Sequence, residues 1–112
     1  MNSIGLTESE KNAEFYFHGT TRFYYERQIK IYGIYRHDEL EHGNSVFVST
    51  NFQTSKRFAE GRAKDWWCPR STPIILKIKG NKVRERVHQH PVINDVCIDY
   101  LLPEEFEVLK TQ

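Results

Sequence analysis

The residues best suited to chemistry in this chain of 112 residues begin with a histidine and a glycine that follow an apolar stretch. Phe15, Tyr16 and Phe17 form an aromatic run that predicts a short strand, and His18 stands at its end. Gly19 has no side chain, so another molecule can approach its backbone closely. A histidine placed in this way is either a buried structural residue or a ligand-binding one. The motifs that follow at fixed spacings along the sequence are needed to distinguish these two interpretations.

The cysteines and the remaining histidines do not predict a metal site. Cys68 and Cys97 are far apart, and neither has a CxxC partner or a histidine at zinc-ligand spacing. His88 and His90 share one face of an extended segment, but a third ligand is missing. We therefore expect reduced thiols, no disulfide and no metal.

Length and composition predict one small domain. Residues 1–12 are mostly polar and are expected to form a flexible arm, which leaves residues 13–112 as the folded unit. The 16 basic and 15 acidic residues nearly cancel, so bulk charge gives no reason for general affinity to nucleic acids or membranes. Without an export signal or a bilayer-spanning apolar run, we expect a cytoplasmic monomer. The 7 Phe, 6 Tyr and 2 Trp residues suit a core or stacking on a planar ligand.

Two strand–helix units are predicted in the first two thirds of the chain. After the strand over 15–18, Thr20 or Thr21 is expected to cap a helix that ends at Gly33, and the charged segment 36–44 is expected to be a surface loop. We expect the apolar face of this helix to be formed by Tyr25, Ile29 and Tyr32.

In the second unit, a strand over 45–49 precedes Thr50 or Asn51, either of which can cap a helix over 52–65. Pro69 restricts the residue before it, so this helix is expected to have ended by then. The residues expected on one face of the helix are Phe52, Ala59, Ala63 and Trp66.

The last third of the chain is predicted to be rich in strands. The clearest signal is the segment 73–79, where apolar residues alternate as in a half-buried strand. Gly80 and Asn81 are expected to turn the chain, and 88–95 is expected to be a loop. The other predicted strands are a short edge strand over 83–87 and strands over 96–100 and 106–109. Helices early and strands late argue for an α+β fold.

Three blocks of residues together resemble ADP-ribosyltransferases of the diphtheria-toxin and poly(ADP-ribose) polymerase (H-Y-E) type. Phe17-His18-Gly19-Thr20-Thr21, a helix and then Tyr32-Gly33-Ile34 is similar to their first block, in which a strand ends in His-Gly-Ser/Thr. Ser45 to Asn51, followed by a helix that carries Phe58, is similar to the second block, whose two aromatic residues are usually tyrosines. Asn94 to Tyr100 matches the third block best, with Asp95 where the family has Glu. The resemblance spans residues 15–109 and implies two small packed antiparallel sheets, two helices and an NAD cleft between them.

The resemblance also implies NAD as the donor substrate. His18 would hold a ribose hydroxyl, and the backbone N–H and C=O of Gly19 would pair with the nicotinamide amide. Phe47 and Phe58 would stack on the nicotinamide ring, for which a phenyl ring serves as well as a phenol. Each of these two rings is also explained by core packing. Further contacts to NAD are assigned to the hydroxyl groups of Thr20, Ser49 and Thr50.

Asp95 would bind the ribose, stabilise positive charge on the sugar and accept a proton where the acceptor requires it, so it joins His18 and Phe47 as a catalytic residue. Its side chain is one methylene shorter than Glu, and a misplacement of about 1 Å can cost on the order of a hundredfold in rate. Other carboxylates that are candidates for this role are Glu85, Glu104 and Glu105.

Arg84, Arg86 and His88, with His90, would lie in the segment that meets the acceptor in the family. They would attract a phosphate backbone or an acidic protein surface, unless they form only a solvated edge strand.

The function expected from the resemblance is mono-ADP-ribosylation of a macromolecule, either a protein or a nucleic acid. Three alternatives stay open: a catalytically silent module that binds NAD or ADP-ribose, a tRNA 2′-phosphotransferase and an NAD glycohydrolase.

Overall fold

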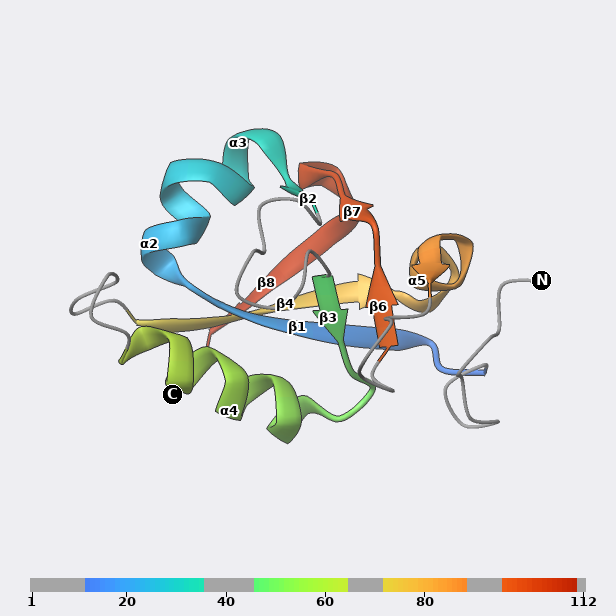
Figure 1. The fold of residues 1–112 in the computed structure, drawn as a ribbon, viewed down its shortest axis with the longest axis horizontal. Coiled ribbons are helices and arrows are strands. Elements are labelled where there is room, and N and C mark those ends of the chain that lie inside the picture. The colour runs from blue at the N-terminus through green and yellow to red at the C-terminus, as the bar shows by residue number, and fades with distance from the viewer. Residues whose placement is uncertain (1–11, 36–45, 65–71, 89–95, 111–112) are drawn as a thin grey trace.

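Alternating apolar side chains in the last third of the chain produce the central strand of the largest sheet. The computed structural model of the chain describes residues 12–35, 46–64, 72–88 and 96–110. In it, β4 (Pro73–Lys79) pairs antiparallel with β1 (Phe15–Thr21) on one side and with β8 (Phe106–Lys110) on the other (Figure 1). The predicted strand over 73–79 is thereby confirmed. The residues of β4 buried on the core face are Ile74, Leu76 and Ile78.

Shorter strands form two further antiparallel sheets. β3 (Val46–Val48) pairs with β6 (Val96–Ile98), which also pairs with β5 (Val87–His88). β2 (Ile34–Tyr35) pairs with β7 (Tyr100–Leu101). The predicted strand over 96–100 is therefore divided into β6 and β7.

The first helical segment lies where the sequence predicts it. It consists of α2 (Arg22–Tyr24), the π-helical turn η1 (Tyr25–Ile29) and α3 (Lys30–Tyr32). The hydroxyl of Thr21 caps it by accepting a hydrogen bond of 3.3 Å from the backbone of the last residue of α2. Gly33 follows α3 with φ of 87°, a conformation that favours glycine, so both predicted boundaries are confirmed.

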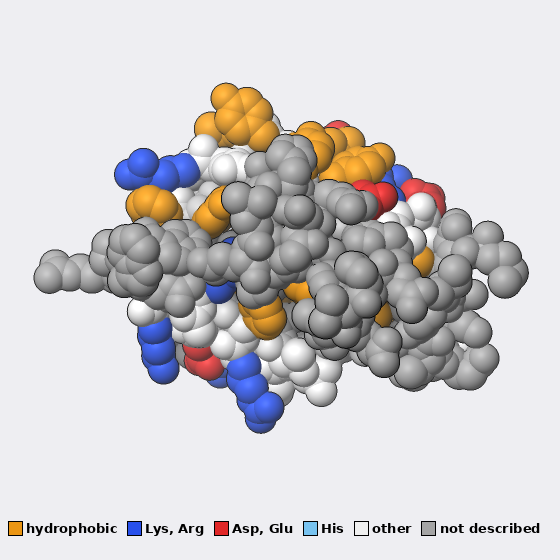
Figure 2. All heavy atoms as spheres, viewed as in Figure 1, with side chains coloured by type: hydrophobic (Ala, Val, Ile, Leu, Met, Phe, Trp, Pro, Cys, Tyr) orange, Lys and Arg blue, Asp and Glu red, His pale blue; other side chains and the backbone are white. Residues whose placement is uncertain are grey.

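The second helix, α4 (Phe52–Ala63), is capped by Asn51, whose side-chain oxygen accepts hydrogen bonds of 2.9 and 3.2 Å from the backbone of Gln53 and Thr54. α4 packs along β1 (Figure 1), and lysine and arginine side chains project from its outer side (Figure 2). Its buried face differs from the predicted one. Among the described residues of α4, the two faces share only Ala59. The buried residues of α4 are Ser55, Ala59 and Arg62.

The third helix is absent from the sequence prediction. α5 (Gly80–Arg86) replaces the predicted turn at Gly80 and Asn81 and most of the predicted edge strand over 83–87. Tertiary contacts explain the difference. Val83 is fully buried, and Arg84 Nη1 donates a hydrogen bond of 2.8 Å to the Ala13 carbonyl.

Taken together, the described residues confirm the predicted α+β class, with an additional helix and with three small antiparallel sheets where the resemblance implied two. The turn η4 (Pro103–Glu105) leads into β8 and lies between the last two strands that the sequence predicts. None of the helices in the described ranges is long and apolar enough to cross a lipid bilayer. The core is built from all three sheets and includes Tyr16, Val46, Val48, Leu76, Ile98 and Leu101.

Candidate functional site

The candidate site lies where β1 and β3 meet. Phe17 and Ser49 exchange two backbone hydrogen bonds, of 2.7 and 2.9 Å, across this junction. On the opposite edge of β1, the chain continues its ladder to β4 with a bond of 2.9 Å from Arg22 N to the Thr72 carbonyl. Since successive residues of a strand direct their backbone groups to alternate edges, the N–H and C=O of Gly19 face β3, as those of Phe17 do.

The ladder between β1 and β3 stops after Phe17. Continued pairing would join Gly19 to Phe47, but the Phe47 carbonyl instead accepts a hydrogen bond of 2.7 Å from Nδ1 of His18. A carbonyl oxygen only accepts, so Nδ1 carries the proton in this contact. His18 is 3% exposed, so water does not compete for the bond. No described residue forms a hydrogen bond with the N–H or C=O of Gly19 on this edge.

Helix α4 occupies the space that Gly19 leaves free. A Cβ atom at Gly19 would lie 2.1 Å from the Ser55 carbonyl oxygen and 2.8 Å from the Ala59 nitrogen. The interpretation that the missing side chain admits another molecule is therefore wrong for this face of the strand. What Gly19 offers a ligand is its backbone edge toward β3.

Phe47 and Phe58, which the sequence pairs on opposite sides of a ligand ring, lie beside this edge. Their ring centroids are 6.5 Å apart and their planes are tilted by 37°. A third ring stacked between two others needs their planes about 7 Å apart, twice the contact distance between carbon atoms. To admit a ligand ring, the two rings would have to move apart and become parallel, and Phe58, the ring on α4, is 36% exposed.

The hydroxyl groups assigned to NAD binding have different surroundings. Thr20 is 1% exposed and lies on the core side of β1, on the same face as His18. The hydroxyl of Ser49 accepts a hydrogen bond of 3.0 Å from the backbone of Asn51, which helps to start α4. Thr50 is half-buried between these two residues. Of these three residues, only Thr20 is buried, and Ser49 is half-buried like Thr50.

The predicted carboxylate Asp95 lies outside the described residues, as does His90. Val96, which follows Asp95 in the sequence, pairs with Val48 in β3, one residue from the junction with β1. The alternative carboxylates belong to other parts of the fold, because Glu85 is exposed on α5 and Glu104 is exposed in η4.

Of the residues assigned to the acceptor, Arg84 and Arg86 lie on α5 and not on an edge strand, whereas His88 lies in β5, at the edge of its sheet. The guanidinium of Arg84 is bound to the Ala13 carbonyl, and that of Arg86 is bound to Glu105. His88 pairs through its backbone with Cys97. Both arginines therefore have a structural role in the described fold.

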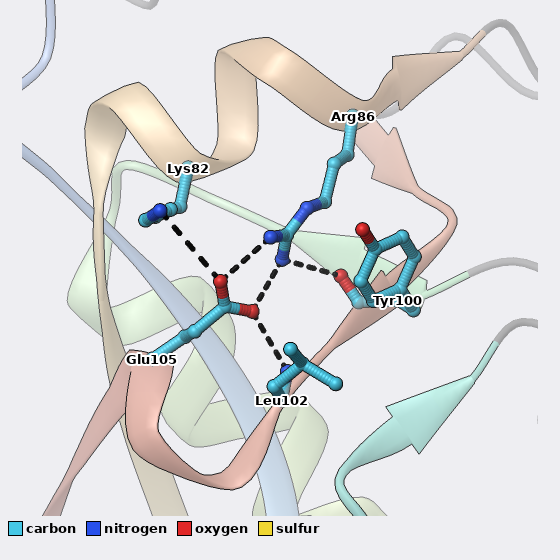
Figure 3. Close-up of polar contacts among 5 residues, drawn as sticks. All are labelled: Lys82, Arg86, Tyr100, Leu102 and Glu105. Atoms are coloured by element: carbon cyan, nitrogen blue, oxygen red, sulfur yellow. Dashed lines mark hydrogen bonds and ion pairs between the residues drawn. The ribbon is translucent and has the colours of Figure 1, made fainter.

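Glu105, the third alternative carboxylate, is the centre of a polar cluster (Figure 3). Its two oxygens accept hydrogen bonds of 2.5 and 2.6 Å from Arg86, and one of them also accepts a bond of 2.8 Å from the Leu102 backbone. Arg86 donates in addition to the Tyr100 carbonyl at 3.2 Å. The hydrogen bonds from Arg86 lower the pKa of Glu105 against the opposing effect of burial, and they raise the pKa of Arg86. Glu105 thus has a structural role, because its hydrogen bonds connect α5 to η4.

One buried basic residue near the site has no counterpart in the sequence prediction. Arg62 is 6% exposed, lies one helical turn beyond Phe58 and places its Cζ atom 6.0 Å from the ring centre of Tyr24. The signal that could have found it is its spacing, since Arg62 follows the small residues Ser55 and Ala59 at intervals of four and three along one helix face.

No protein-family model, no curated protein sequence and no solved structure matches this chain. Within the ranges that the structure describes, no three His, Cys, Asp or Glu side chains are grouped so that they could hold a metal ion.

Proposed function

We propose that this chain is an NAD-dependent mono-ADP-ribosyltransferase that modifies a macromolecule, either a protein or a nucleic acid. The observation that supports this proposal is the interrupted ladder at Gly19. It leaves one backbone donor and one backbone acceptor side by side on a buried strand edge, next to the rings of Phe47 and Phe58.

Nicotinamide has the chemistry that this arrangement requires. Its primary carboxamide offers an oxygen to the N–H of Gly19 and an N–H to the Gly19 carbonyl, and its ring is flat enough to stack on Phe47 and Phe58. Buried backbone groups are nearly always paired in folded proteins, so a ligand that pairs with both groups of Gly19 removes an energetic cost. A ligand with a carboxylate in place of the carboxamide lacks the N–H and would leave the Gly19 carbonyl unpaired.

The reaction follows from fixing the nicotinamide in this position. The bond between the nicotinamide nitrogen and ribose C1′ breaks, and its electron pair leaves with the nitrogen, which neutralises the pyridinium charge. C1′ acquires positive charge, and an oxygen or nitrogen atom of the acceptor bonds to it and loses a proton. Such a reaction depends chiefly on positioning and on electrostatic stabilisation of the sugar. We assign that stabilisation to Asp95, as the sequence predicts.

The direct test is incubation of the purified chain with cell lysate and NAD labelled in its adenylate portion. We expect label to enter a macromolecule and nicotinamide to be released in equal amount. Asp95→Ala should abolish transfer, and Phe58→Leu should lower it about fivefold to a hundredfold, since stacking on a base or ring contributes about 1–3 kcal/mol. Tyr32→Leu is the matched control, because this exposed aromatic residue lies on α3, away from Phe47 and Phe58.

Other outcomes of the same test would replace the proposal. Binding of NAD without release of nicotinamide would indicate a silent binding module. Free ADP-ribose in the absence of lysate would indicate a glycohydrolase. Formation of ADP-ribose cyclic phosphate from an RNA with a 2′-phosphate would indicate a phosphotransferase.

A further inference from the structure

A groove lies on the half of the main sheet that α4 leaves uncovered. α4 begins at Phe52, whose ring meets that of Phe17 edge-on at 5.6 Å between centroids, and from there the helix covers Gly19. The other half of this sheet face, toward α5 and η4, holds a groove of about 440 Å³, a volume within the range of small-molecule sites. The groove is lined by Phe15, Lys77, Lys79, Lys82, Glu104, Glu105, Phe106 and Glu107.

Three lysine ammonium groups line this groove. Lys77 places Nζ 4.0 Å from the ring centre of Phe15, and no described carboxylate forms an ion pair with Lys77 or Lys79. Lys82 lies 3.8 Å from Glu105, but the oxygen it approaches already accepts a hydrogen bond of 2.6 Å from Arg86 (Figure 3). Breaking a cation–π contact of this kind near the surface costs about 0.5–1 kcal/mol. An incoming anion can therefore recruit these lysines at little cost.

The groove also carries two carboxylates that have no structural role in the described fold. Glu107 lies directly across the sheet from Lys77 in the pairing of β4 with β8, and Glu104 is exposed in η4. Carboxylates only accept hydrogen bonds, so they would repel a phosphate but would bind hydroxyl or amino groups. The groove thus favours a ligand that carries both an anionic group and hydrogen-bond donors.

We propose that this groove binds a ribonucleotide, with the phosphate at Lys79 and Lys82, the ribose hydroxyls at Glu104 and Glu107, and the base against Phe15. A ribonucleotide carries an anion, a pair of hydroxyl donors and a flat ring on one small molecule, and each part has a matching group in the groove. The ligand is either a free nucleotide or the same unit within a single RNA strand. This site is separate from the one at Gly19, and its occupation does not depend on the transferase activity.

The test is titration of the full-length, ¹⁵N-labelled protein with AMP at low salt, followed by NMR. We expect saturable shifts at Phe15, Lys79 and Lys82, with Gly19 unaffected. Because losing one of two phosphate contacts is a partial loss, Lys79→Gln and Lys82→Gln should each weaken AMP binding about tenfold. Lys30→Gln, on α3, is the matched control for the loss of one positive charge and should bind AMP as the wild type does.

Different ligands test each part of the proposal. Deoxy-AMP should bind more weakly than AMP if Glu104 and Glu107 bind the ribose, and a tetranucleotide of adenylate that binds more tightly than AMP would identify RNA as the source. The proposal is overturned if AMP causes no saturable shift, if the shifts fall at Gly19 and Phe58, or if inorganic phosphate binds as tightly as AMP. If the protein binds AMP at the groove but does not bind nicotinamide, this inference holds and the proposed function is wrong.

Discussion

The packing of Gly19 against α4 predicts that a side chain at this position destabilises the fold. Gly19→Ala should destabilise the fold by about 3 kcal/mol, since the new Cβ would overlap the Ser55 carbonyl and force the helix away from β1. Gly61→Ala is the matched control on α4. No atom lies within 4 Å of a Cβ built there, so the change should stabilise the protein by about 1 kcal/mol through helix propensity. Urea denaturation measures both values, and equal stability of the two variants would refute the packing argument.

His18 is expected to keep the strand edge at Gly19 available. Its Nδ1–H occupies the Phe47 carbonyl that Gly19 would otherwise pair with, at a distance of 2.7 Å. An Asn side chain places an amide N–H close to the position of Nδ1, so His18→Asn should retain nicotinamide binding, whereas His18→Ala should lower the affinity about tenfold or more.

Amide hydrogen exchange gives an independent measurement of the same claim about His18. In His18→Ala the strands β1 and β3 can pair further, and exchange at Gly19 should slow. If the Gly19 amide exchanges rapidly in both the wild type and His18→Ala, and the two proteins bind nicotinamide equally well, His18 does not control this edge.

Between elements, the cluster around Glu105 fixes α5 against η4. The side chains of Arg86 and Glu105 are 11% and 9% exposed, and removing one member of such a pair leaves the other charge buried. Glu105→Gln should therefore cost about 3 kcal/mol at neutral pH. Glu104→Gln, on the exposed side of the same turn, should change stability by less than about 0.5 kcal/mol.

The pH dependence of this cluster follows from the pKa of Glu105, which is lower in the folded state than its ordinary value of 4.5. The unfolded state then binds a proton more readily, so the stabilisation by Glu105 is fully present above that value and is lost as the pH falls through the lower pKa of the folded state. The difference in unfolding free energy between wild type and Glu105→Gln should shrink below about pH 4.5. A difference that is constant from pH 7 to pH 3 would contradict the assignment.

The elements also show what the sequence can predict. The strand over 73–79, the cap at Thr21 and the glycine at 33 were predictable, because alternation, capping and positive φ are local properties. α5 was not predictable, because the burial of Val83 and the partners of its arginines come from segments distant in the sequence.

The same distinction applies to the candidate site. The pairing of Phe47 with Phe58 followed from spacing and resemblance, and the structure brings the two rings together. The interrupted ladder at Gly19 did not follow, since it depends on which backbone groups two distant strands exchange. The burial of Arg62 was missed because a charged residue on an apolar helix face is normally read as exposed.

For the whole molecule, one sheet carries the two proposed binding surfaces at its two ends. α4 covers the end at Gly19, where the strand edge meets Phe47 and Phe58, and the uncovered end forms the lysine-lined groove beside α5. α3 adds exposed hydrophobic side chains at a third position on the surface (Figure 2), since Ile31 and Tyr32 are 59% and 64% exposed.

The most direct test is the NMR signal of the Gly19 amide during titration with nicotinamide and, in parallel, with nicotinic acid. A hydrogen bond from Gly19 N–H to the carboxamide should shift this signal downfield in a saturable way, with nicotinic acid at least about tenfold weaker because it cannot donate to the Gly19 carbonyl. A Gly19 signal that does not respond to nicotinamide, or that responds equally to both compounds, would contradict the proposal that this strand edge holds the leaving group of NAD.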